Sequence, residues 1–256
     1  MLLHLSTWRE IEAYLERSQG IIIPLGSTEQ HGPNGLIGTD SICPTIIAEQ
    51  ASNISDILVG PTITLGVAQF NLGFPGSVTV RPSTLMALLE DYVLSLVQQG
   101  FQRFYFLNGH GGNIAPTRAA FQEIYTAYSI RNDSSQAPRC RLRSWWELAN
   151  ANQLRQTLYG DWEGFHATPS EVAIAQYAYP NAIKTYPLTE PTRVSKDYIR
   201  NHTGDDHYDA ADHRRRYPDG RIGSDPSLAN PHAGKQLVAA AAADLLDDYQ
   251  AFLAED

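Results

Sequence analysis

The sequence contains few cysteines and little positive charge. Its two cysteines, Cys43 and Cys140, are too few for a disulfide framework, and their separation fits no zinc-finger spacing. Lys and Arg number 19 against 28 Asp and Glu, which gives a formal net charge of −9. Nucleic acids and anionic membrane surfaces bind clustered Lys and Arg, so the composition argues against both as partners.

Long apolar runs are missing as well. No stretch approaches the roughly 18 apolar residues of a membrane span, and residues 1–20 lack the basic start and apolar core of a signal peptide. We therefore expect a cytoplasmic protein. Hydrophobic residues make up 43% of the chain, which is ordinary for a globular protein. No linker-like stretch divides the sequence, so we predict a single domain over residues 1–256.

Helical and strand patterns alternate along the chain. Buried strands are predicted over residues 21–25, 57–65, 103–109 and 139–146, and helices over 8–18, 40–52, 83–99, 114–129, 170–178 and 231–252. Thr7 and Ser83 are the expected caps of the first and third helices. Residues 66–81 and 179–221 are predicted to be irregular. Strands separated by helices imply parallel strands joined by right-handed crossovers, which predicts an α/β fold.

Polar side chains gather after three of the predicted strands. In chain order they are Glu29, His31 and Asp40, then Asn108, His110 and Asn113, then, further along, Trp162, His166 and Glu171. Ligands of α/β sheets collect at the carboxyl ends of the strands. We therefore expect these side chains to meet at one rim of the sheet.

Carboxylates and imidazoles at one rim predict a metal site. Hard carboxylate oxygens with neutral imidazoles suit Zn²⁺, Mn²⁺ or Fe²⁺, and Asp40 can bridge two ions roughly 3.5 to 4 Å apart. Three glycines around His110, at 109, 111 and 112, would let metal and substrate approach the backbone. An imidazole near its ordinary pKa, such as His166, would suit proton transfer.

Each signal also has a plainer explanation. The Glu29 and His31 pair fits a capped turn, and "NGHGGN" fits a strand-to-helix turn or a phosphate cradle at a helix N-terminus. That segment lacks the lysine of a P-loop and the glycine spacing of a dinucleotide fingerprint. His166 and Glu171 could be a buried histidine and a helix-start carboxylate. The conjunction of all these residues at strand ends favours the metal site.

Two other features are predicted to be structural. Residues 201–220 hold His202, His207 and His213 among acidic residues, and we expect a solvated or subunit-contact loop rather than a ligand cluster. Cys43 lies inside a predicted apolar helix, which favours a buried thiol over a nucleophile.

Four segments resemble a known family. "PLGSTEQHGPNGLIGTD", "LNGHGGN" and "HATPSE" are similar to the signature blocks of the creatininase (creatinine amidohydrolase) family, and "RIGSDPSLANPHAGKQL" resembles its C-terminal block. The resemblance implies a layered α/β fold with a central, mostly parallel sheet flanked by helices. It also implies two divalent metal ions per chain, hydrolysis of amide C–N bonds and commonly a homohexamer.

The resemblance assigns roles to individual residues. Glu29, His31, Asp40 and His110 match metal ligands, with Asp40 as the bridge. Trp162 matches a tryptophan that covers the substrate, and His166 matches a catalytic histidine. Asn108 matches only a motif position, and we assign it to substrate binding.

The chain departs from the family pattern at one ligand. Members that hydrolyse creatinine carry a metal-binding glutamate two residues after the motif histidine, where this chain has Gly112. "NGHGGN" is instead similar to the branch that contains the archaeal formamidopyrimidine deformylase and the mycofactocin precursor peptidase. In that branch a later glutamate can complete the site, and Glu171 is the candidate, as metal ligand and catalytic residue. We expect Gly112 to leave a void beside the metal.

The sequence thus predicts a metal-dependent amidohydrolase acting on a small or cyclic amide other than creatinine. Trp162 and the loop over residues 66–77 are expected to cover this substrate. Three alternatives stay open: a metallopeptidase or deformylase of the same family, a non-catalytic metal-binding or assembly protein that kept the fold, and an enzyme of phosphate-bearing ligands that uses "NGHGGN" as a cradle.

Overall fold

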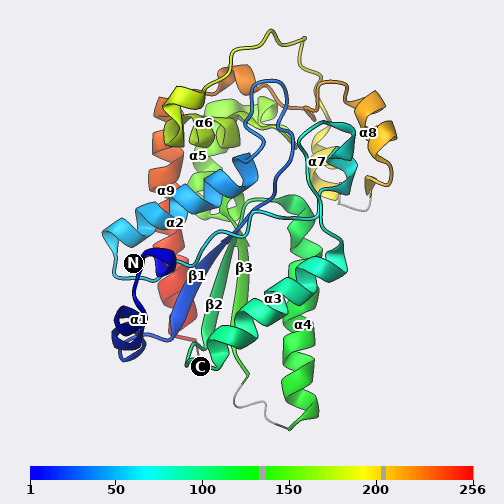
Figure 1. The fold of residues 1–256 in the computed structure, drawn as a ribbon. Helices are drawn as coiled ribbons and strands as arrows, with labels where there is room; N and C mark the ends of the chain where they lie inside the picture. Colours follow the sequence, from blue (N-terminus) through cyan, green and yellow to red (C-terminus); the bar gives the residue numbers. More distant parts are fainter. Residues whose placement is uncertain (133–136, 203–205, 256) are drawn as a thin grey trace.

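Three parallel strands form the centre of the fold. A computed structural model describes residues 1–132, 137–202 and 206–255, and its sheet has the order β1 (Gly20–Leu25), β2 (Arg103–Asn108), β3 (Arg139–Ser144) (Figure 1). Leu25 pairs with Asn108, and Asn108 with Ser144. All three strands therefore end at the same edge, which confirms the predicted α/β fold with a parallel sheet.

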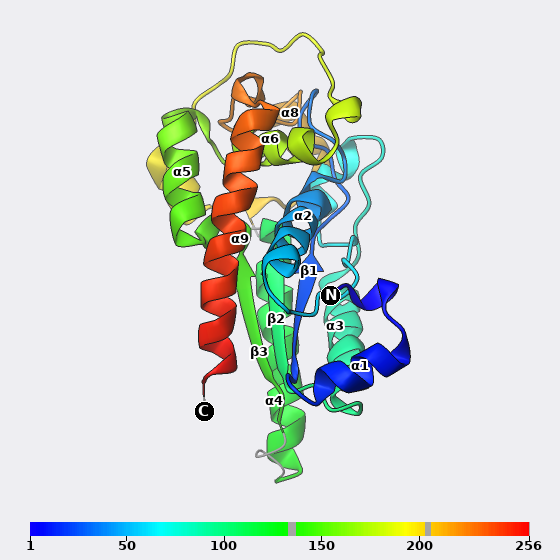
Figure 2. The same ribbon diagram turned by 90° about the vertical axis from the view of Figure 1, so that its left-hand side faces the viewer.

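Helices cover both faces of this sheet (Figures 1 and 2). Side chains alternate across the pleat, so Ile22 and Tyr105 pack with α2 (Thr39–Ile54) and α9 (Pro231–Leu253). Ile23 and Phe106 pack on the other face with α3 (Pro82–Val97) and α4 (Ile114–Ile130). The layers are those that the family resemblance implies. None of the described helices is long and apolar enough to cross a membrane.

The strand predicted over residues 57–65 is wrong. This segment makes only isolated bridges with β1, from Val59 to Ile22 and from Ile63 to Leu25. Pro61 lies between these two bridges and has no N–H to donate, so it interrupts a continuous hydrogen-bond ladder. The segment still covers the edge of β1.

Helix boundaries follow the sequence patterns closely. Helix α1 (Trp8–Leu15) begins with the expected cap, since Thr7 and Glu10 form a capping box. The expected cap Ser83 is wrong, because α3 begins at Pro82 with Arg81 as its N-cap. Among the described residues, three α-helices fall where none was predicted: α5 (Ala149–Tyr159), α7 (Lys196–Asn201) and α8 (Ala210–Arg216). Helix α6 (Pro169–Ala178) is the predicted one.

Helices α5 to α8 gather beyond the carboxyl edge of the sheet (Figure 1). There α8 packs on the 3₁₀ turn η2 (Gln69–Gly73). His207 stacks on Phe70 with ring centres 4.3 Å apart, and His213 meets Phe70 edge-on at 5.0 Å. Both histidines are buried. The expected solvated loop is therefore wrong for them, because aromatic contacts hold them inside, while residues 203–205 of that run lie outside the described residues.

The burial of these two histidines leads us to predict that the protein is less stable in mild acid. Burial, with the nearby His202, lowers the pKa of His207 to about 3 and that of His213 to about 4. An unfolded histidine has a pKa of about 6.5, so the unfolded chain binds more protons below that pH. The free energy of unfolding therefore falls as the pH drops from about 6.5 towards 4.

Replacing His213 by Phe should weaken this pH dependence, because one buried titrating group is lost. Urea unfolding at pH 7.5 and at pH 5 would measure it. His232 is exposed, so His232→Phe serves as the control and should lose as much stability in acid as the unaltered protein. An unchanged pH dependence in His213→Phe would contradict the assignment.

Candidate metal centre

The five predicted metal ligands lie together, and all of them are buried. Glu29 and His31 follow β1, Asp40 lies in the first turn of α2, His110 follows β2, and Glu171 lies in the first turn of α6. Each therefore stands at the carboxyl edge of the sheet or at a helix start facing it. The rim expected from the sequence exists.

Asp40 is the centre of this group. Its Oδ1 lies 3.0 Å from His31 Nε2, and its Oδ2 lies 3.1 Å from His110 Nδ1. Two sets of three residues have ligand atoms within 4.8 Å of one another: Glu29, Asp40 and His110, and His31, Asp40 and Glu171. Asp40 is common to both sets, with one oxygen turned towards each histidine. This arrangement suits a carboxylate that bridges two cations.

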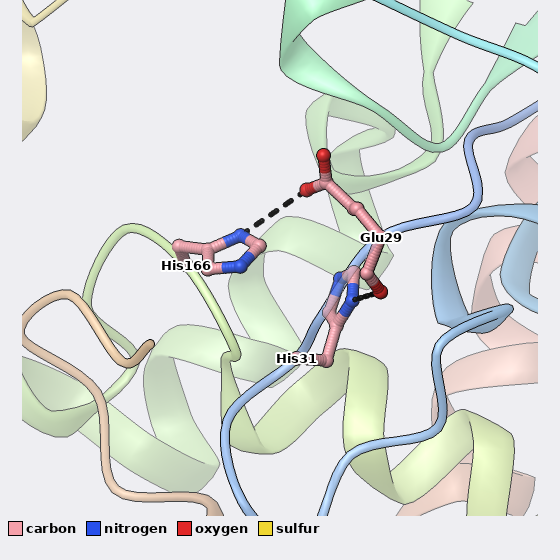
Figure 3. Close-up of side chains that lie close together, drawn as sticks. All are labelled: Glu29, His31 and His166. Carbon is pink, nitrogen blue, oxygen red and sulfur yellow. Dashed lines mark hydrogen bonds and ion pairs between the residues drawn. The ribbon is translucent and has the colours of Figure 1, made fainter. Parts of the chain in front are cut away.

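His166 lies beside the same carboxylates. Its Nδ1 is 3.6 Å from Glu29 Oε1 (Figure 3), and with Glu29 and His31 it forms a third set of close ligand atoms. Burial, together with the nearby His31, lowers the pKa of His166 well below its ordinary value. The expectation of an imidazole near its ordinary pKa is therefore wrong, because the side chain is buried beside other cationic groups.

Main-chain carbonyl groups orient the two ligand imidazoles. His31 Nδ1 donates to the carbonyl oxygen of Glu29 at 3.1 Å (Figure 3), and His110 Nε2 donates to that of Val67 at 2.9 Å. A carbonyl oxygen only accepts, so these nitrogens carry protons and the opposite nitrogens face Asp40. Metal-binding histidines are typically held by such a second hydrogen bond.

Protons balance the buried charges in this cluster. Burial alone would lower the pKa of His31 and of His110, but the carboxylates raise these values to about 10 and about 9. Burial would raise the pKa of Asp40, but the two histidines hold it well below its ordinary value. Burial raises the pKa of Glu29 to about 7, against the effect of His110, and also raises that of Glu171. Among the five predicted ligands, three carboxylates stand against two imidazoles, so this set favours cations.

Several ligand atoms have few partners. Within the described part of the chain, Glu29 Oε2 is buried without a hydrogen-bond partner, and His31 Nε2 and Asp40 Oδ2 are buried with only the ion pairs of the cluster itself. Buried polar atoms are costly when unsatisfied. Divalent cations would satisfy all three atoms, and the donor set of carboxylates and imidazoles is one that Zn²⁺ and Mn²⁺ accept.

Gly112 leaves no void, contrary to expectation. A Cβ placed there would lie 2.2 Å from the carbonyl oxygen of Val67 and 2.6 Å from His110 Nε2. Glu171 lies near His31, with Oε2 3.8 Å from His31 Nε2. Its other oxygen accepts the N–H of Thr168 and completes a capping box at the start of α6. One carboxylate thus caps the helix and faces the site.

Gly109 is needed for packing rather than for open space. Pro44 lies inside α2 and has no N–H, so the carbonyl group of Asp40 loses its helical partner. The backbone at Gly109 packs against that carbonyl, and a Cβ would lie 2.0 Å from its oxygen. This contact sets the strand end carrying His110 against the helix turn carrying Asp40.

The contacts of Asn108 and Trp162 do not show a role in substrate binding. The amide of Asn108 accepts from the N–H of His110 at 3.1 Å and donates to its carbonyl oxygen at 2.8 Å. These two bonds show that Asn108 fixes the backbone of His110, and substrate binding by Asn108 stays a prediction. Trp162 is half-buried, with the guanidinium of Arg193 4.4 Å from its ring centre. Its role over the substrate also stays a prediction.

The buried polar residues that sequence reasoning overlooked include Gln30, Glu163 and Asn71. Gln30 lies between Glu29 and His31 in the quoted motif and is buried. Glu163 follows Trp162 and pairs with Arg155 at 3.0 Å. Asn71 lies in the loop predicted to be irregular, where no pattern marks it. Gln30 was detectable by its place inside a motif and Glu163 by its place beside Trp162, whereas the burial of Asn71 depends on the tertiary fold.

Curated proteins with similar sequences are hydrolases. A 3-dehydro-scyllo-inosose hydrolase of Thermotoga maritima is 35% identical over 106 residues, and a mycofactocin precursor peptide peptidase of Mycolicibacterium smegmatis is 34% identical over 106. These alignments cover 41% and 39% of this chain and only 34% and 42% of those proteins. A creatinine amidohydrolase of Pseudomonas putida is 25% identical over 191 residues, with 69% of this chain and 71% of that protein covered.

Solved structures share the whole fold. A crystal structure of creatinine amidohydrolase superposes with a TM-score of 0.79 at 19% identity and covers 100% of this chain and 98% of its own. A manganese form of creatininase gives 0.77 at 19% identity, with 99% of each chain covered. The family profile described as creatininase, creatinine amidohydrolase, matches residues 4–248. The chain therefore belongs to the creatininase family of hydrolases.

Proposed function

We propose that this chain is a metal-dependent amidohydrolase that cleaves the C–N bond of a small or cyclic amide with two divalent ions, Zn, Mn or Fe. The observation that carries the proposal is the shared position of Asp40 between two sets of buried ligand atoms. Manganese and zinc forms of creatininases with the same fold support the choice of metals. A creatininase complexed with creatine supports a small molecule as the partner.

The ions, when bound, supply a hydroxide from water and polarise the amide carbonyl. The chain's own residues hold the ions, move a proton and cover the substrate. Glu29, His31, Asp40, His110 and Glu171 hold the ions, and the backbone contacts of His31 and His110 fix their rings. His166 is neutral at pH 7 because its pKa is lowered, so it can accept a proton and pass it to the leaving nitrogen. Trp162 and residues 66–77 cover the substrate.

A peptide or formamide bond is the second candidate. Mycofactocin precursor peptide peptidases are relatives of this chain, and they support this candidate. The homohexamer, the cytoplasmic location and the single domain over residues 1–256 remain predictions that accompany the proposal.

Turnover and metal content test the proposal together. Protein purified without chelator would be screened against creatinine, other cyclic amides, formamides and short peptides, with its metals counted by mass spectrometry. We expect two ions per chain and hydrolysis that stops with chelator and returns with Zn²⁺ or Mn²⁺. Bound metal without turnover of any amide would favour a binding protein. Affinity for phosphate esters that survives chelation would favour the phosphate cradle.

Asp40 and His31 should differ in their effect on the metals. Asp40 belongs to both sets of ligand atoms, so Asp40→Ala should remove both ions and abolish activity, whereas His31→Ala should weaken mainly one ion. Mass spectrometry after dialysis against a defined Zn²⁺ buffer would measure both. Equal and mild losses in the two variants would contradict the bridging role.

Glu171→Gln should lower activity by roughly 10² to 10⁴-fold, which is the range for the loss of an acid or base group. Its metal content should fall as well. Glutamine keeps an oxygen for the N–H of Thr168, so the helix cap is retained and the lost charge is tested alone. Full metal content with full activity would reduce Glu171 to a helix cap. Thermal unfolding of both proteins serves as the control for folding.

Gly112→Glu should not convert the chain into a creatinine hydrolase. The new Cβ would press on the backbone of Val67 and on His110, so we expect lower stability and weaker metal binding. Gly111→Glu is the matched control, because the same side chain there has open space. Efficient creatinine hydrolysis by the unaltered protein, or by a stable Gly112→Glu variant, would contradict this reasoning.

A further inference from the structure

Two buried amides join the metal centre to the turn η2. Gln30 Nε2 donates to Asn71 Oδ1 at 2.8 Å and to the carbonyl oxygen of Gly220 at 3.1 Å. Gln30 Oε1 accepts the N–H of Gly32 at 2.8 Å, which fixes the orientation of this amide. Asn71 is fully buried in η2, the turn that packs against α8. Neither side chain is among the proposed metal ligands.

Counting hydrogens assigns the proton on His166. An amide NH₂ has two hydrogens, and Asn71 Oδ1 and the oxygen of Gly220 take both. None is left for His166 Nε2, although it lies 2.9 Å from Gln30 Nε2. The same ring nitrogen lies 2.8 Å from the main-chain oxygen of Gln30, which only accepts. Nε2 of His166 therefore carries the proton and donates to that oxygen.

The other ring nitrogen of His166 is then bare. Nδ1 faces Glu29 Oε1 at 3.6 Å in a buried space (Figure 3). Two acceptor atoms that face each other away from water favour a cation or a donor hydrogen between them. In this tautomer the basic nitrogen of His166 points at the metal centre, where it can receive a proton.

We propose that Asn71 and Gln30 are positioning residues that hold His166 in the tautomer with its proton on Nε2 and a bare Nδ1 at the metal centre. Asn71 acts by accepting one hydrogen of Gln30. Without that acceptor the hydrogen turns to His166 Nε2, and the proton of the ring moves to Nδ1. The catalytic meaning rests on the proposed function, but the tautomer itself does not.

Asn71 also has a direct effect on a ligand. Its Nδ2 has no hydrogen-bond partner among the described residues, and the amide lies near enough to Glu29 to lower the pKa of that carboxyl, although burial raises it more. The oxygen of the Asn71 amide thus acts on His166 through Gln30, and its nitrogen acts on Glu29 by proximity. The variant Asn71→Asp separates these two effects, because a carboxylate keeps the acceptor and loses the donor.

Nitrogen NMR of the metal-free full chain tests the proposal without turnover. With ¹⁵N-histidine labelling at pH 8, a bare ring nitrogen and a protonated one give well-separated shifts, and a His166→Gln sample identifies the signals of His166. We expect a bare Nδ1 in the unaltered protein and in Asn71→Asp, and a shift of the proton to Nδ1 in Asn71→Leu. In a parallel titration, Asn71→Leu should bind Zn²⁺ about 10-fold more weakly.

Asn113→Leu is the matched control. Asn113 is equally buried and also joins the loop at Val67 to the end of β1 at Gly26, but it does not contact Gln30. It should leave the tautomer unchanged. A proton on Nδ1 in the unaltered protein, no change in a folded Asn71→Leu, or an equal change in Asn113→Leu would each overturn the proposal. If Asn71→Leu fails to fold, a proton on His166 Nδ1 in Asn71→Asp would overturn the proposal. Protein that binds no Zn²⁺ yet shows the expected tautomers would refute the proposed function alone.

Discussion

The carboxylate of Asp40, buried between two imidazoles, is the interaction on which the rest of the centre depends. Each of its oxygens faces a different histidine, and a buried carboxylate is tolerated only with cationic partners. In the metal-free chain protons on His31 and His110 supply the positive charge. The same ligand atoms lie close enough together to hold a metal ion in place of those protons.

The scaffold makes this arrangement possible by bringing three strand ends to one edge. The register sets Leu25, Asn108 and Ser144 side by side, and the loops that leave the strands carry Glu29, His31 and His110. Pro44 and Gly109 then bring α2 against the end of β2, because one frees a carbonyl group and the other gives it room. Neither residue is a ligand, yet both set where Asp40 lies relative to His110.

The region beyond the sheet edge connects the centre to the rest of the chain. Residues 69–73 carry Asn71, and Phe70 among them packs against His207 and against His213 of α8. After α8, Ile222 forms an isolated bridge with His166, and the nearby Gly220 accepts a hydrogen bond from Gln30. Residues 220–222 therefore contact both His166 and Gln30, which lie far apart in the sequence.

Much of this could be predicted from sequence, because it is encoded by local patterns. Alternating apolar runs and helical spacing mark three strands and six helices, and strand ends followed by Glu29, His31, Asp40 and His110 mark the site. Only the tertiary structure decided what local patterns do not carry. Residues 57–65 have the composition of a strand but pair with β1 at isolated points around Pro61. Gly112 suggests a void that the carbonyl group of Val67 fills. Asn71, His207 and His213 owe their burial to contacts between segments far apart in the chain, since burial depends on which surfaces meet and not on neighbours in sequence.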